Sequence, residues 1–555
     1  MSRKLALLVI GTAIGLGACA PAEQADEQAQ AALAMISADD LVRHVQVLGS
    51  DEYEGRFPGT AGEQKTLDYL QAEVERIGLQ PGVGDGWFQE VQLVSITADP
   101  GMTLTVAGPD GSSQYTYGSE FMAWTTRVVE EIDLESSELI FVGYGTVAPE
   151  YGWNDYEGLD VAGKTVVMLV NDPGFATKDP ALFNGNSMTY YGRWTYKYEE
   201  AARQGAAAAL IIHDTEPAAY GWATVEGSWS GPQLNMVTED NNMSRVQVEG
   251  WLQLEVAREI FEMAGLDLDE LTRQATQRDF EPVHMGVSVS TALRNRVERS
   301  ISHNVLGILP GGERADEYVI YMGHWDHLGM NADLEGDQIF NGAADNASGV
   351  AGILELAEAF TSLPRRPLRS IVFLWTTAEE QGLLGSAYYA ANPIYPLEKT
   401  AGAINIDGLN IYGRMHDIYV IGYGNSELDE YLIEFADQQN RVVKPDAEAE
   451  KGFFYRSDHF PLAKMGVPAL YTDVGDDHLE HGEEWTRQRK DEWTAQQYHQ
   501  PSDEYSADWD LAGAVDDLRL WFLVGYKLAN ESTFPNWNEG TEFKAIRDQM
   551  MAATN

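Results

Sequence analysis

The stretch Tyr318-Val-Ile-Tyr-Met-Gly-His-Trp-Asp-His327 decides the fold, because an apolar run ends in a cluster of potential metal ligands. The apolar and aromatic residues 318–322 are typical of a strand buried inside a sheet. Two similar runs follow at 370–375 and 403–406, and residues 348–360 have apolar side chains at helical spacing. This alternation predicts an α/β fold, with a mixed, mainly parallel central sheet flanked by helices.

Polar side chains follow each of the three predicted strands. His324 and Asp326 follow the first strand, Glu379 and Glu380 the second, and Asp407 the third. Sites in such sheets form at the carboxyl ends of the strands, so we expect these side chains to meet at one edge. Asp407 has no basic neighbour in the sequence, and a metal would supply the partner that a buried acid needs.

Two further segments contain ligands of the same kind. Asp345 lies in the turn Ala343-Ala-Asp-Asn-Ala-Ser-Gly349, whose small residues let the backbone approach a metal closely. Asp345 is also a good helix cap, and the two roles are compatible. His499 lies in Tyr498-His-Gln-Pro-Ser-Asp503, where the Pro and the Asp would hold the turn. Two His and three carboxylates suit a pair of zinc ions, and a spare Glu beside them suits amide hydrolysis by water.

The individual residues also allow plainer interpretations. A lone His is more often structural than a ligand, but Asp326 could accept the second ring N–H of His324 and fix its tautomer. His327 competes with His324 for the ligand role. Adjacent acids such as Glu379 and Glu380 are usually a solvated pair, whereas at a buried strand end one could bind metal and the other accept a proton from water.

Length and charge narrow the class of protein. A chain of 555 residues is too long for one core, so we expect two domains. The formal net charge of −50 is spread along the chain, which is typical of a solvated, self-repelling surface. Nucleic acid is excluded as a partner, because phosphate binding needs clustered Lys and Arg.

Residues 1–18 resemble a bacterial lipoprotein signal peptide. Two basic residues precede an apolar run over 5–16 that is too short to span a bilayer, and Leu16-Gly-Ala-Cys19 resembles a lipobox. The resemblance implies cleavage before Cys19, the only cysteine, and attachment of a lipid to its thiol. An ordinary signal peptidase site is the alternative.

The residues after the signal suggest where the protein resides. Residues 19–36 are rich in Ala, Gln and Glu and are expected to form a flexible tether. Ala20 is not the Asp of an inner-membrane retention signal, so we expect an exported protein at the periplasmic face of the outer membrane or at the cell surface. The lipid is its only expected membrane contact, because no later apolar stretch is long enough to span. The sequence leaves the oligomeric state open.

The sequence pattern in the middle of the chain differs from that of its flanks. It resembles the protease-associated domain that is often inserted into secreted zinc peptidases, on the segments 143–145, 160–164 and 201–212. The expected division is a main domain over 37–125 and 291–535, a β-rich α/β insert over 126–290, and a C-terminal tail over 536–555.

One motif in the insert imitates a nucleotide site. Gly158-Leu-Asp-Val-Ala-Gly-Lys-Thr165 matches the phosphate-binding P-loop by letter. A P-loop needs a following helix whose N-terminus meets the phosphate. Here residues 166–170 are typical of a strand, so we expect a turn and no nucleotide.

The order of the ligand segments resembles the M28 family of zinc peptidases, aminopeptidase type. The resemblance covers about 40–120 and 295–525, and the insert fits the remainder. It implies two bound Zn²⁺ ions and no missing ligand. The implied ligands are His324 and Asp407 for one ion, Glu380 and His499 for the other, and Asp345 as the bridge.

The same resemblance implies the supporting roles. Glu379 matches the general base, and Asp326 matches the acid that orients His324. Arg456-Ser-Asp-His-Phe460 matches a segment beside the ligands. The candidates in and next to that segment are Asp458, His459 and Tyr455.

Other hydrolase classes lack their signatures. The sequence has no H-E-x-x-H and no G-x-S-x-G, and its only cysteine lies in the signal. We expect a di-zinc metallo-exopeptidase, most simply an aminopeptidase that acts on peptides through a metal-bridging water and Glu379. The alternatives are a carboxypeptidase or dipeptidase of the same family, which would need a cation such as Arg456, a one-zinc glutaminyl cyclase, and a non-enzymatic peptide-binding protein.

Overall fold

The structure, a computed structural model, describes residues 22–554. The predicted signal peptide, Cys19 and Ala20 lie outside the described residues. Among residues 22–554, none of the helices combines the length and the apolar character that a membrane span requires.

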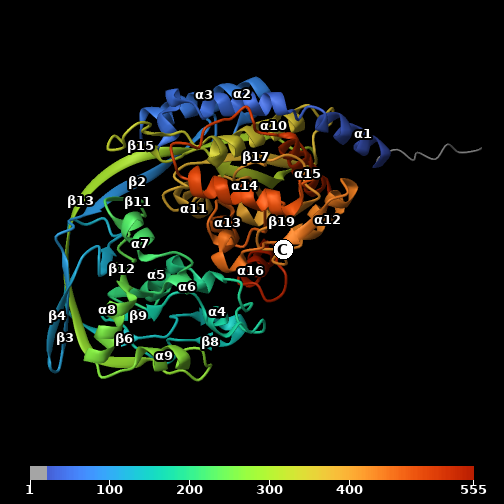
Figure 1. The fold of residues 1–555 in the computed structure, drawn as a ribbon. Coiled ribbons are helices and arrows are strands. Elements are labelled where there is room, and N and C mark those ends of the chain that lie inside the picture. The colour runs from blue at the N-terminus through green and yellow to red at the C-terminus, as the bar shows by residue number, and fades with distance from the viewer. Residues whose placement is uncertain (1–21, 555) are drawn as a thin grey trace, which may run out of the picture.

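Two lobes share one long strand. Strand β13 (Val283–Leu309) pairs with β6 (Glu131–Phe141) in one lobe and with β17 (Arg369–Thr376) in the other. Figure 1 shows β13 curving from the lower lobe into the upper one. We call residues 99–294 the inserted lobe and the rest the main lobe, because β13 changes partner between Arg294, opposite Glu131, and Asn295, opposite Ala98.

The main lobe is built on a mixed sheet. Its central strands β17, β14 (Arg314–His324), β18 (Thr400–Asn405) and β21 (Ala469–Val474) are parallel. Antiparallel strands complete its two edges, which confirms the predicted fold class. These strands are β1 (Gln80–Pro81), β2 (Phe88–Ala98), β13, β19 (Asp417–Val420) and, parallel to β19, β20 (Val442–Pro445). The inserted segment also adds one strand to this sheet, β11 (Pro232–Met236), which pairs with β2.

Helices cover both faces of this sheet. Along β17, Ile371 and Phe373 belong to one buried cluster, while Val372 and Leu374 belong to another, as expected for a strand buried on both faces. The first face is covered by α1 (Ala22–Leu33), α2 (Ala38–Leu48), α3 (Ala61–Ile77), α10 (Gly349–Thr361), α12 (Leu428–Gln438) and α15 (Ala512–Asn530). The second is covered by α11 (Leu384–Ala391), α13 (His459–Lys464) and residues near α16 (Lys544–Thr554).

The inserted lobe has its own sheet and its own core. Strands β6, β9 (Thr165–Leu169), β10 (Ala208–His213) and β12 (Val248–Gln253) are parallel neighbours. The letters that imitate a P-loop lead into β9 rather than a helix, as predicted. The remaining elements are β3 (Thr103–Gly108), β4 (Gly111–Thr116), β5 (Phe121–Trp124), β7 (Val147–Ala148), β8 (Trp153–Asn154), α4 (Pro173–Thr177), α5 (Trp194–Arg203), α6 (Thr215–Ala218), α7 (Trp222–Trp229), α8 (Leu254–Met263) and α9 (Leu268–Gln274).

The lobe boundary and both ends of the chain differ from expectation. The insert begins before residue 126, because β3 pairs with β13 and β5 with β12. The predicted tether contains helix α1, whose small buried residues Ala29 and Ala32 let it pack closely on the main lobe. The predicted tail is folded too, because Trp537 and Phe543 are buried in the core.

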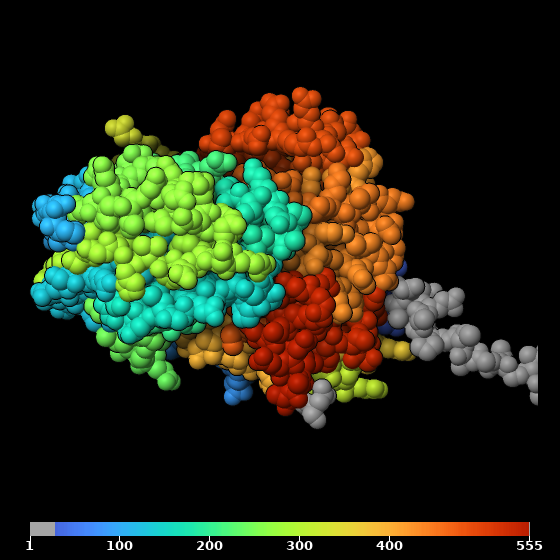
Figure 2. All heavy atoms as spheres, turned by 90° about the horizontal axis from the view of Figure 1, so that it is seen from below, coloured from blue at the N-terminus to red at the C-terminus, as the bar shows by residue number. Residues whose placement is uncertain are grey.

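The two lobes touch and enclose a cavity. Figure 2 shows the spheres of the inserted lobe packed against the orange and red C-terminal residues. Met188 N–H donates to Ala449 O at 3.1 Å, and Tyr190 N–H donates to Glu542 Oε1 at 3.2 Å. A cavity of about 1760 Å³ lies between the lobes and reaches the carboxyl ends of the main-lobe strands.

Candidate metal centre

Three neighbouring strand ends bring the predicted ligands together. His324 ends β14 opposite Thr376, the last residue of β17, and Met322 lies opposite Asn405 at the end of β18. Glu379 and Glu380 therefore emerge beside His324 on one side, and Asp407 on the other. Parallel strands place these residues at the same sheet edge, as the sequence predicted.

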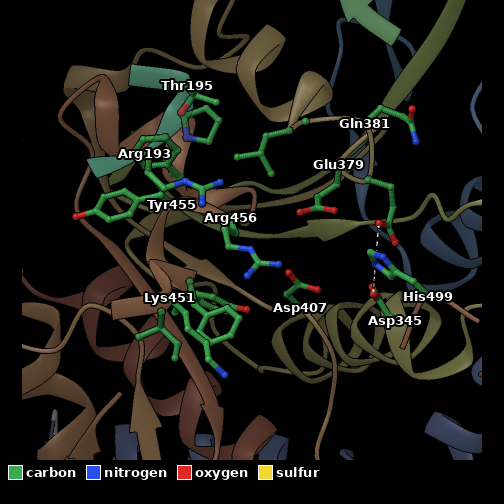
Figure 3. A pocket seen from close by; sticks show the side chains of 18 of the residues that line it. Arg193, Thr195, Asp345, Glu379, Gln381, Asp407, Lys451, Tyr455, Arg456 and His499 are labelled. Atoms are coloured by element: carbon green, nitrogen blue, oxygen red, sulfur yellow. Dashed lines mark ion pairs between the residues drawn. The ribbon is translucent and has the colours of Figure 1, made fainter. Parts of the chain in front are cut away.

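Asp345 lies between two imidazoles. Its Oδ1 is 3.3 Å from His324 Nε2, and its Oδ2 is 3.4 Å from His499 Nε2. His324 Nε2 is also 3.2 Å from Asp407 Oδ1, and His499 Nε2 is 3.1 Å from Glu380 Oε2. The five residues thus form two ligand groups that share Asp345, the division that the resemblance implied. Figure 3 shows Asp345, Asp407 and His499 around the cavity with Glu379.

His327 lies closer to these groups than the sequence suggested. Its Nδ1 is 2.6 Å from Glu380 Oε1, while His499 faces the other oxygen of Glu380. His327, Asp345 and Glu380 together form a possible metal-binding triad, and His327 Nε2 is buried without a hydrogen-bond partner in the described part of the chain. His327 therefore either orients Glu380 or serves as a ligand itself.

Glu379 and Asp326 occupy positions that fit their predicted roles. Glu379 Oε2 lies 3.9 Å from His324 Nε2. Asp326 Oδ1 accepts the backbone N–H of Glu379 at 3.1 Å. His324 Nδ1 lies 3.1 Å from the backbone oxygen of Asp326 and 3.9 Å from its carboxylate. The main-chain carbonyl, rather than the carboxylate alone, thus orients His324.

The neighbours of Asp345 leave its carboxylate available for the site. Asn346 Oδ1 accepts the N–H of Gly349 at the start of α10, so Asn346 caps the helix and Asp345 stays free for the site. Asn346 Nδ2 also donates to His324 O and Ile406 O, which ties two strand ends together. Asp503 accepts the N–H groups of Ala344 and Asp345, so the segment containing His499 also holds the Asp345 turn.

In the segment after Tyr455, the residue that contacts a predicted ligand is Ser457, which the sequence had not singled out. Ser457 Oγ donates to Asp407 Oδ2 at 2.7 Å and accepts from Asn405 Nδ2 at 2.7 Å. Asp458 is buried nearby and accepts from Thr376 Oγ1 at 2.5 Å. The other two candidates point elsewhere. His459 packs on Phe454 and Tyr471, and the hydroxyl of Tyr455 donates to Glu542.

Arg56 is a positioning residue that the sequence did not reveal. Its buried guanidinium donates to Trp325 O, Asn341 O and Gly342 O at 2.6–2.9 Å. It thereby joins the loops that contain His324 and Asp345 to the N-terminal part of the main lobe. A single Arg between Gly55 and Phe57 has no recognisable signature, because its partners beyond Leu48 O are backbone carbonyls more than 260 residues away.

The electrostatics of the site favour cations. Burial raises the pKa of Glu379 well above its ordinary value, and Asp407 and Glu380 add to the effect against the opposing influence of His324. Burial likewise raises the pKa of Asp326 to about 8. For His499, burial lowers the pKa, but Asp345 and Glu380 outweigh burial and raise it to about 10. Four carboxylates thus compete for the imidazoles of His324, His327 and His499, and divalent cations bound by this donor set would balance the charge.

Comparisons with known proteins agree with this geometry. Residues 304–522 match peptidase family M28. "Aminopeptidase NAALADL1" of Mus musculus is 37% identical over 127 residues, which are 22% of this chain and 16% of that protein. "Leucine aminopeptidase 2" of Arthroderma otae is 30% identical over 194 residues, 33% of this chain and 36% of that protein.

A solved structure shows the same fold over nearly the whole chain. The "Aminopeptidase from Aneurinibacillus sp. strain AM-1" superposes with a TM-score of 0.51 at 20% identity, covering 92% of this chain and 97% of that one. The curated relatives, in contrast, are matched over 16% and 36% of their own lengths.

Proposed function

Because residues 304–522 belong to peptidase family M28, we propose that the protein is a di-zinc aminopeptidase that removes N-terminal residues from peptides. The observation that supports the proposal most strongly is Asp345, whose two oxygens face His324 and His499 separately. One carboxylate between two imidazole–carboxylate pairs is the arrangement that a two-ion centre needs. The names of the relatives support the choice of the amino end.

Zinc bound by these residues would polarise the scissile carbonyl and lower the pKa of an attacking water. Glu379 is the group that accepts the proton of that water and then delivers it to the leaving amine. Its raised pKa makes Glu379 a stronger proton acceptor than an ordinary carboxylate. The Asp326 carboxylate keeps Glu379 in place by accepting the backbone N–H of Glu379.

The decisive test is hydrolysis of leucine p-nitroanilide with metal analysis. The purified protein should contain two Zn²⁺ per chain, lose activity to a chelator and regain it with added Zn²⁺. N-acetylation of the substrate should abolish cleavage, because it removes the free amine. A protein that cleaves only N-blocked peptides would instead be the carboxypeptidase of the same family. A single zinc with cyclising activity would indicate the glutaminyl cyclase, and peptide binding without any cleavage the non-enzymatic alternative.

We also propose export and lipid attachment at Cys19. The basic start, the short apolar run and Leu16-Gly-Ala-Cys19 support this, and residues 99–294 would then be a protease-associated domain outside the cytoplasm. Radiolabelled palmitate should enter the wild type but not Cys19→Ser. Equal labelling of the two would reject the lipid anchor.

A further inference from the structure

Two arginines from different lobes face the same cavity as the metal centre. Arg193 precedes helix α5 of the inserted lobe, and Arg456 lies between Tyr455 and Ser457 of the main lobe. Figure 3 shows both guanidinium groups pointing into the space that Glu379 and Asp407 also line. The inserted lobe therefore contributes a charged side chain to the site.

Neither guanidinium has an acidic partner among residues 22–554. Arg193 Nε is buried and makes no hydrogen bond to the described residues. Arg456 packs its guanidinium over the ring of Phe453, 5.0 Å from the ring centroid, and forms no ion pair in the same range. The buried Nε of Arg193 loses its hydration without replacement, which proteins rarely tolerate except where a ligand supplies the partner. Arg456 is exposed, so its charge is available to a ligand that enters the cavity.

The surrounding composition makes the two free cations more unusual. The chain has 87 Asp and Glu against 37 Lys and Arg, so acids are available almost everywhere to pair with a cation. Other cations on the cavity wall are paired. Arg487 contacts Asp476 and Glu483, and Lys490 contacts Asp476.

The contacts between the lobes hold Arg193 in place. Met188 bonds Ala449, and Lys464 of the main lobe donates to Tyr190 Oη at 2.8 Å and pairs with Glu199 at 2.7 Å. A Cβ on Gly452 would come within 3.5 Å of Arg193 Cδ, so the Arg193 stem lies directly on the main lobe. These contacts pre-organise Arg193 for an anion, which lowers the entropic cost of binding.

We propose that Arg193 and Arg456 bind a carboxylate of the peptide substrate, foremost the free α-carboxylate of a short peptide whose amino end lies at the metal centre. The inference rests on the proposed aminopeptidase function and defines its substrate class. Guanidinium is the side chain whose fork matches a carboxylate. Because the two arginines come from different lobes, only the assembled protein forms the pair. An acidic side chain of the peptide offers the same chemistry, and the experiment separates the two sources.

The first experiment compares four peptides with the wild type: Leu-Gly-Gly and its C-terminal amide, and Leu-Glu-Gly and Leu-Gln-Gly, both as amides. We expect amidation of Leu-Gly-Gly to lower kcat/KM by roughly 10- to 100-fold, the effect of losing charge-assisted hydrogen bonds. A preference for Glu over Gln without an effect of amidation would assign the site to an acidic side chain. Equal rates for all four peptides would overturn the proposal.

The second experiment measures selectivity in variants. In Arg193→Gln and Arg456→Gln, the ratio of kcat/KM for Leu-Gly-Gly to that for leucine p-nitroanilide, which has no carboxylate, should fall roughly 10- to 100-fold. In these variants, amidation of Leu-Gly-Gly should lower kcat/KM only slightly further. Arg487→Gln is the matched control, since Arg487 lines the cavity with its charge already paired, and its ratio should stay within about twofold of wild type.

The outcomes distinguish this inference from the proposed function. Equal losses on both substrates would mean that the arginines only support the fold, and the inference would be wrong. Normal cleavage of the arylamide without any carboxylate preference would overturn the inference and leave the aminopeptidase intact. Absence of cleavage of every substrate by the zinc-loaded wild type would overturn both.

Discussion

Both lobes bury charge beside a parallel sheet, but only one of them balances it. In the inserted lobe, Lys197 is fully buried and donates to Tyr144 O and Asn171 O, with Asp155 and Asp172 nearby. Asp155 accepts from Thr146 N–H and Trp153 Nε1, so its oxygens are occupied. Each ionisable group in this cluster has hydrogen-bond partners within the lobe, and in this sense the cluster is balanced.

The main lobe leaves an excess of negative charge at its sheet edge. Asp345, Glu379, Glu380 and Asp407 share the imidazoles of His324, His327 and His499, and the buried guanidinium of Arg56 donates only to backbone carbonyls. Burial by itself therefore does not mark a functional site, because structural clusters bury charge as well. The imbalance marks the site, since cations from outside must complete it.

The largest expected effect comes from Glu379→Gln. Removing the proton acceptor should lower kcat for leucine p-nitroanilide by roughly 10²- to 10⁴-fold, while zinc content stays at the wild-type value. The same kind of change at a balanced acid, Asp155→Asn, should leave kcat within about twofold. A Glu379→Gln variant with wild-type turnover would contradict the assignment of the base.

Lys197→Met tests the balanced cluster of the inserted lobe. Removing its cation leaves Asp155 and Asp172 buried without a positive neighbour, so unfolding free energy should fall by roughly 3–5 kcal/mol. Zinc content should not change, because no predicted ligand lies in this lobe. Chemical denaturation measures the loss, and Lys178→Met, at an exposed Lys of the same lobe, is the control. A loss no larger than that of the control would show that the cluster is not balanced by Lys197.

Ser457→Ala tests whether supporting hydrogen bonds matter at the unbalanced edge. Ser457 orients Asp407, and loss of such a bond typically weakens metal binding by roughly 10- to 100-fold. Competition with a zinc chelator of known affinity measures the change. Ser457→Thr retains the hydroxyl and should restore most of the affinity. Unchanged zinc affinity in the Ala variant would remove Ser457 from the site.

Glu355→Gln gives the smallest and most pH-dependent effect. Burial raises the pKa of Glu355 to about 7, so the folded state holds a proton that the unfolded chain releases above its ordinary pKa of 4.5. Its contribution to stability is therefore fully present below pH 4.5 and is lost as pH rises through 7. The variant should be more stable than wild type by roughly 1–3 kcal/mol at pH 8 and equal to it near pH 4. A stability difference that does not vary between these pH values would contradict the raised pKa.

Much of the site was predictable because its ligands follow strands that are easy to identify. Apolar runs before His324, Glu379 and Asp407 predicted both the strands and their common edge. The sequence was less informative about Arg56 and Ser457, whose roles depend on atoms far away in the chain. It also assigned residues 19–36 to a flexible tether and 536–555 to a tail outside the main domain, since polar composition hides the few small or aromatic residues that pack.

The amino-acid sequence determined the α/β class and the identity of the ligand types, because hydrophobic periodicity and residue chemistry are local properties. Tertiary structure alone decided that Asp345 divides its oxygens between two imidazoles, that Arg56 joins the loops and that Arg193 of one lobe meets Arg456 of the other. Those relations depend on how strands register and how lobes pack over hundreds of residues, and no local pattern encodes such distances.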